Sequence, residues 1–110
     1  MTDTSTEAGA VFDIERERSG GGCRYWTLVD GRTGLLMYED EKTPNGIRRN
    51  AYSTRVDSAL SGRGVGLALV QRLVEDAREE RASINPQCSF VRVMIGRNKD
   101  WADVLVEDGP

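Results

Sequence analysis

Apolar and polar residues alternate along the first half of the chain, which is the pattern of half-buried β-strands. Glycine-rich turns separate the alternating stretches. One of them, Asp30-Gly31, is typical of a two-residue hairpin. Another, at 43–46, contains Pro-Asn-Gly. The pattern predicts four strands, at Ala10–Arg18, Cys23–Val29, Gly34–Tyr38 and Ile47–Val56.

After Gly62 the period of the apolar residues becomes helical, and we expect one long helix from Gly64 to about Arg81. Its polar face carries Arg72 and Asp76, which stand four residues apart and can form an ion pair. The opposite face carries small and apolar residues, namely Gly66, Leu69, Val70, Leu73 and Ala77.

The last third of the chain predicts a short strand and a second helix. Pro86 cannot lie inside a helix and restricts the residue before it, so residues 83–88 are expected to be extended. Ser89 is a candidate N-cap for a helix that reaches about Arg97. The segment 100–106 then returns three apolar side chains to the core: Trp101, Val104 and Leu105.

Together these elements predict an α+β fold. We expect a mixed, mostly antiparallel sheet, with the long helix after the glycine turn and a second, C-terminal helix. The chain has 110 residues, which suits one domain with a modest core. We place this domain at residues 10–106, between a flexible N-terminal tail at 1–9 and a C-terminal tail at 107–110.

Composition narrows the classes of function. The net charge of −3 is spread evenly, which disfavours nucleic-acid binding. No apolar run is long enough for a membrane span. The polar N-terminus has no apolar h-region, so we do not expect it to be a signal peptide. Two cysteines are too few for a disulfide framework, so we expect a reducing, cytoplasmic setting. The absence of histidine excludes Ser-His-Asp and Cys-His catalysis and any His-ligated metal.

The segment Ser61–Gly66, here called the glycine turn, joins a predicted strand to the long helix. Its alternate glycines permit unusual backbone angles and close approach of a ligand. The free N–H groups of the first helical turn favour an anion such as a pyrophosphate, and Arg63 could add a charged contact. A tight turn that binds nothing is the alternative. The spacing fits neither a Rossmann fingerprint nor a Walker A loop.

The stretch Val56–Leu73, VDSALSGRGVGLALVQRL, resembles the acetyl-CoA motif Arg/Gln-x-x-Gly-x-Gly/Ala of the GCN5-related N-acetyltransferases. The chain is most similar to the small single-domain branch of that superfamily. In this branch a His-Thr-Glu-Val strand end precedes the glycine turn and helix, and Pro-x-Cys and a short helix ending near Asn-Pro follow. The corresponding residues here are Ser53–Val56, Gly62–Gly66, Pro86–Val91 and Arg97-Asn98.

This resemblance implies acetyl-CoA as cosubstrate, a small-molecule or protein amine as acceptor, and no metal. The acyl group would lie near Ser53 and Cys88, where two strands separate. The amine would attack the thioester directly, or the acyl group would pass through a cysteine. The protein would be a monomer or a homodimer. The residues implied in cofactor binding are Val56, Ser61, Gly62, Arg63, Gly64, Val65, Gly66 and Leu67.

Three positions depart from the family pattern. Ser61 replaces the Arg/Gln before the turn, Ser53 replaces the histidine at the strand end, and Met94 replaces a tyrosine that commonly protonates the leaving thiolate. Serine is a poor base and methionine donates no proton. Loss of one general acid or base typically costs ~10²–10⁴ in rate. The departures favour a second hypothesis, a non-catalytic acyl-CoA binder or sensor. A domain that keeps only the fold is the third.

Cys88 directly precedes the second predicted helix, where a helix N-terminus lowers a thiol pKa. It is a candidate acyl-carrying nucleophile, or else a small buried apolar residue. Tyr25 and Tyr52 could line a substrate groove or belong to the core. The acidic run 39–41 could attract a cationic amine or form a solvated hairpin edge. We expect Arg48 and Arg49 to face solvent.

Overall fold

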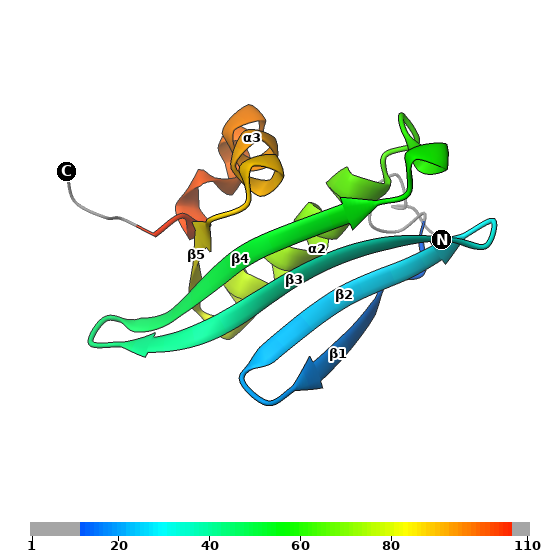
Figure 1. Ribbon diagram of the computed structural model, residues 1–110. Helices are drawn as coiled ribbons and strands as arrows, with labels where there is room; N and C mark the ends of the chain where they lie inside the picture. The colour runs from blue at the N-terminus through cyan, green and yellow to red at the C-terminus, as the bar shows by residue number, and fades with distance from the viewer. Residues whose placement is uncertain (1–11, 107–110) are drawn as a thin grey trace, which may run out of the picture.

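The computed structural model describes residues 12–106, which form one twisted sheet with helices on one face (Figure 1). The predicted tails at 1–9 and 107–110, with the first two residues of the first predicted strand, lie outside the described residues. The strands are β1 (Glu15–Ser19), β2 (Gly22–Val29), β3 (Arg32–Thr43), β4 (Gly46–Val56) and β5 (Ala82–Pro86). The helices are α2 (Val65–Glu80) and α3 (Ser89–Arg97), with 3-10 helices η2 (Ser58–Leu60) and η3 (Lys99–Val104).

The sheet has the strand order β1-β2-β3-β4-β5. The first four strands pair antiparallel, and β5 pairs parallel to β4. The parallel pair arises because α2 carries the chain back along the sheet before β5 begins, which is the usual connection between parallel strands. The predicted α+β fold with a mixed, mostly antiparallel sheet is confirmed.

Two predicted strand boundaries are wrong. β3 runs to Thr43 rather than ending at Tyr38, because the charged residues 39–42 and Thr43 continue the ladder with β4. Side chains on both faces of this part are largely exposed, so no apolar alternation marks it. β1 begins only at Glu15. Phe12 and Ile14 precede it and pack, half-buried, against the core.

The core lies between the sheet and α2. All five residues predicted for the apolar face of this helix are buried. They meet buried side chains from the three central strands, chiefly Tyr25, Leu36 and Ala51. The predicted return of the C-terminal segment is also confirmed. Val104 is buried, and Trp101 and Leu105 pack against the core.

The expectation that Arg49 faces solvent is wrong, since its side chain is only 3% exposed. Residue 49 of β4 faces α2, whose last turn supplies Glu80. Nε of Arg49 lies 2.8 Å from Oδ1 of Asp40, and Nη2 lies 2.8 Å from Oε1 of Glu80. Its guanidinium carbon lies 4.5 Å from the ring centroid of Tyr38. Two carboxylates and one aromatic face therefore compensate the buried charge.

A second polar group is built around Asp76 of α2. The predicted Arg72–Asp76 pair is present, with Nε 3.1 Å from Oδ2. The hydroxyl of buried Tyr25 donates to the same oxygen at 2.6 Å. Burial and this hydrogen bond raise the pKa of Tyr25 above its usual value, so the hydroxyl stays a donor. These contacts tie α2 to the middle of the sheet.

Candidate functional site

The glycine turn leaves β4 through η2 and enters α2 directly. Asp57 caps η2, with its Oδ1 accepting from the amide of Ala59 at 2.9 Å. Gly62 and Gly64 then adopt φ angles of +80° and +82°, which L side chains rarely take. The turn therefore depends on glycine at these two positions for conformational reasons.

Space and free donors meet at this turn. Residues 61–64 are exposed, and a Cβ added at Gly62 or Gly64 would have no atom within 4 Å. Gly64 is the N-cap of α2 and supplies no capping side chain. The first helical hydrogen bond runs from the amide of Ala68 to the carbonyl of Gly64 at 3.0 Å. The amides of Val65, Gly66 and Leu67 thus have no helical acceptor and suit an anion.

Gly66 serves a different purpose from the other two glycines. It is buried, and a Cβ there would lie 2.5 Å from Cζ of Phe90. The missing side chain therefore lets α3 approach the first turn of α2. This contact fixes the distance between the glycine turn and the start of α3.

Arg63 does not point freely at the turn. Its Nη1 lies 2.9 Å from Oδ2 of Asp30, in the β2–β3 hairpin. Their side chains are 46% and 75% exposed, and such surface pairs contribute little to stability. The guanidinium is therefore available to exchange Asp30 for a phosphate at low cost. The other residues predicted at this site, Ser61 and Val56, are exposed and half-buried respectively.

β4 and β5 separate beside the predicted catalytic residues. Their pairing ends at Ala51 and Pro86. The amide of Cys88 still donates to the carbonyl of Ala51 at 2.9 Å, and α3 then begins. Beyond that point, in the part of the chain that the structure describes, residues 53–56 of β4 pair only with β3. We call this opening between β4 and β5 the strand gap. Figure 1 shows β5 and α3 diverging from β4 there.

Ser53 and Cys88 both lie at the strand gap, but no hydrogen bond joins them among the described residues. Sγ of Cys88 instead lies 3.5 Å from Oγ1 of Thr54. Burial raises the pKa of the Cys88 thiol, but hydrogen bonds from Thr54 and from the amides of Val91 and Phe90 outweigh it, and the net pKa is lowered. The sequence prediction that Ser89 caps α3 is wrong, because Cys88 is the N-cap and Ser89 the first helical residue.

Replacing Thr54 by valine should raise the pKa of Cys88, because the hydroxyl that stabilises the thiolate is lost. At neutral pH we expect alkylation by iodoacetamide to slow about three- to tenfold, since the thiolate is the reactive form. The rate is measured against pH in a Cys23→Ser background, which leaves one reactive thiol. An unchanged pH profile in Thr54→Val would show that this hydroxyl does not act on the thiol.

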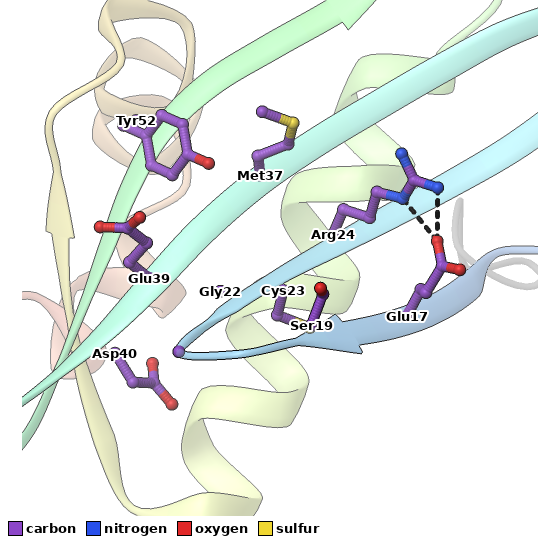
Figure 2. A pocket seen from close by; sticks show the side chains of 10 residues that line it. Glu17, Ser19, Gly22, Cys23, Arg24, Met37, Glu39, Asp40 and Tyr52 are labelled. Carbon is purple, nitrogen blue, oxygen red and sulfur yellow. Dashed lines mark hydrogen bonds and ion pairs between the residues drawn. The ribbon is translucent and has the colours of Figure 1, made fainter.

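A hollow lies on the sheet face opposite α2, and the sequence did not predict it (Figure 2). Its volume is about 690 Å³, and β1, β2, β3 and β4 all contribute to its lining. At one end stand Met37, Glu39 and Tyr52, and at the other an ion pair between Arg24 and Glu17. The sequence signals were Tyr52 and the acidic run 39–41, but nothing in the pattern placed them together.

Within residues 12–106, no helix is long and apolar enough to cross a membrane. Nor do three or more cysteine, aspartate or glutamate side chains in this range form a group that could hold a metal ion. The described chain presents uncapped amides at the glycine turn and an open strand edge at the strand gap.

Comparisons with known proteins bear on the fold and the family of this chain. The comparison with curated proteins finds no match. Among solved structures, the chain is similar to a ribosomal-protein-alanine N-acetyltransferase from Brucella melitensis biovar Abortus 2308, with a TM-score of 0.59 and 17% sequence identity. The match covers 84% of this chain and 67% of that one, and it shows a shared fold. The model of the GCN5-related N-acetyl-transferase family matches residues 24–104. This chain belongs to the GCN5-related N-acetyltransferase family.

Proposed function

We propose that the protein transfers an acetyl group from acetyl-CoA to an amine. Family membership implies an acyl-CoA cosubstrate and an amine acceptor. The observation that carries the proposal is the glycine turn, where two glycines at positive φ stand before an uncapped helix N-terminus. An acyl-CoA pyrophosphate matches these donors in charge and size.

The strand gap supports the rest of the cofactor's placement. With its pyrophosphate on the amides of residues 65–67, the pantetheine arm would run along the free edge of β4, at residues 52–56. Extended amide groups of the arm can pair with such an edge as an added strand does. The thioester would then reach the strand gap beside Ser53 and Cys88.

The acyl transfer has two possible routes. In the direct route the amine nitrogen attacks the thioester carbon, and the C–N bond forms as the C–S bond breaks. Coenzyme A leaves as a thiolate, and the nitrogen gives up its proton to this thiolate or to solvent. In the covalent route the Cys88 thiolate attacks first and coenzyme A leaves as a thiolate. The amine then attacks the acyl-cysteine, whose C–S bond breaks to return the Cys88 thiolate, and the nitrogen gives up its proton to a thiolate or to solvent. The hydrogen bonds that lower the thiol pKa favour a reactive Cys88.

A second candidate function is a non-catalytic acyl-CoA binder or sensor. Two specific residues favour it. Ser53 stands where the family pattern has histidine, and Met94, half-buried against the core, stands where it has tyrosine. Neither can move a proton as the family residue does. Cytoplasmic location and a monomeric or dimeric state stay predictions from the sequence.

One assay separates these functions. The protein is incubated with acetyl-CoA and a panel of primary amines, and released coenzyme A is measured with a thiol reagent. Release above the amine-free blank supports the transferase. Saturable acetyl-CoA binding without release supports the binder. Intact-mass spectra of wild type and Cys88→Ala test the covalent route, which predicts a transient acetyl adduct on the wild type alone.

A further inference from the structure

The hollow on the open sheet face adjoins the strand gap. Tyr52 lines the hollow and directly follows Ala51, whose carbonyl accepts from the amide of Cys88. The β3–β4 register skips Tyr52, with Met37 opposite Ser53 and Tyr38 opposite Ala51, so Tyr52 is the extra residue of a β-bulge. Its side chain is 42% exposed. A molecule in the hollow therefore has a path to the proposed acyl group.

Most charges around the hollow are already neutralised. Glu17 accepts from Nε of Arg24 at 2.6 Å, and Asp40 is held by Arg49 at 2.8 Å. Glu39 differs, since its carboxylate forms no hydrogen bond or ion pair within residues 12–106. The hollow thus offers one uncompensated carboxylate, which favours a positively charged ligand.

The lining near Glu39 also has apolar surface. Met37 of β3 and Tyr52 of β4 stand on neighbouring strands close to Glu39, as Figure 2 shows for the three side chains. A thioether and an aromatic ring suit an aliphatic chain, and an aromatic face also attracts a cation. The volume of about 690 Å³ lies in the ordinary range for small-molecule sites.

Resting on the transferase function proposed above, we propose that the acceptor is an aliphatic diamine or polyamine. One ammonium group binds Glu39, the alkyl chain lies over Met37 and Tyr52, and the far amine reaches the acyl group at the strand gap. β3 and β5 flank β4, so two strand spacings, roughly 10 Å, set the distance between the two amines. The reacting amine must lose its proton to solvent before it attacks, whereas the anchoring ammonium keeps its proton beside Glu39.

Two acceptors of matched length test this. With saturating acetyl-CoA, kcat/KM for 1,8-diaminooctane should exceed that for 8-amino-1-octanol about five- to tenfold, because only the diamine can pair one ammonium with Glu39 while it presents a second amine to the acyl group. Glu39→Gln should remove the preference by raising KM for the diamine, and leave KM for acetyl-CoA unchanged. Glu41→Gln is the matched control, two residues along the same strand and outside the hollow. Equal use of both acceptors, or equal effects of the two variants, would overturn the inference.

A binding measurement separates this inference from the transferase function. In a titration of the acetyl-CoA-free protein with 1,8-diaminooctane, followed by NMR, the amides of Met37, Glu39 and Tyr52 should shift, and Glu39→Gln should abolish the shifts. Shifts without coenzyme A release would contradict the transferase and support the cation site. The absence of shifts at millimolar diamine would contradict the cation site, whatever the enzyme acetylates.

Discussion

Replacing Glu80 by glutamine is expected to lower the free energy of unfolding by roughly 2–3 kcal/mol. Its carboxylate lies 2.6 Å from Nη1 of Arg16 and 2.8 Å from Nη2 of Arg49. Arg49 is buried, and its Nη1 already has no hydrogen-bond partner. The variant would leave Asp40 as the one carboxylate on this buried guanidinium. A charge that loses a buried partner costs more than a surface pair contributes.

The same carboxylate makes stability depend on pH. The hydrogen bond from Arg16, opposed by burial and reinforced by Arg49, lowers the pKa of Glu80 to about 2 in the folded protein. The unfolded chain holds this group near its ordinary value. The stabilisation is therefore fully present above the ordinary pKa and is lost as pH falls toward about 2. Wild type should lose stability across this acid range, and Glu80→Gln should lose less.

Urea unfolding followed by circular dichroism measures both effects. Glu79→Gln, an exposed neighbour on the same helix, is the matched control and should change stability by less than about 0.5 kcal/mol. If Glu80→Gln and Glu79→Gln unfold at the same urea concentration at pH 7, the contacts of Glu80 do not hold the sheet and α2 together.

Replacing Gly64 by glutamate is expected to weaken acetyl-CoA binding about 100-fold. A Cβ at this position meets no atom within 4 Å, so the new carboxylate would occupy the open space before the α2 amides. There it would repel a pyrophosphate, and two like charges 4 Å apart cost about 1–4 kcal/mol in surroundings between water and a protein surface. Each 1.4 kcal/mol is about tenfold in affinity.

Two controls separate charge from backbone strain. Gly64→Ala also places a side chain at the positive φ of residue 64, but it adds no charge. It should therefore weaken acetyl-CoA binding far less than Gly64→Glu does. Gly20→Glu places a glutamate at another open glycine of φ +61°, in the β1–β2 turn. It should leave the affinity for acetyl-CoA unchanged in calorimetric titrations. A Gly64→Glu protein that folds and binds as tightly as wild type would place the pyrophosphate elsewhere.

Local pattern was enough to predict much of this fold. The glycine turn and α2 follow from a clear change of period at Gly62 and from an apolar stripe on one helix face. The prediction from Pro86, an extended segment before a second helix, agrees with the end of β5 at Pro86 and the start of α3 at Ser89. These signals are local, since each depends on residues within a few turns of the chain. The predicted placement of Ser53 and Cys88 near one another needed the family resemblance, because the two residues lie on different elements.

The features that sequence missed depend on contacts between distant segments. The sequence pattern predicts Arg49 to be a surface residue, because it does not show that Asp40 and Glu80 surround its guanidinium. The end of β3 carries charges on both faces, and only its pairing with β4 makes it a strand. The hollow arises because four strands and a bulge at Tyr52 meet on a face that no described helix covers (Figure 1). The alternation of apolar and polar residues along one strand cannot predict which residues of four strands come together.

The most direct test of acyl-CoA binding at the glycine turn is a titration of the ¹⁵N-labelled protein with acetyl-CoA, followed by NMR. We predict saturable binding, with the largest shifts at the amides of Val65, Gly66 and Leu67, which have no helical acceptor. The free edge of β4 at residues 52–56 should shift next. An absence of shifts at millimolar acetyl-CoA, or shifts confined to residues away from the glycine turn, would contradict the account.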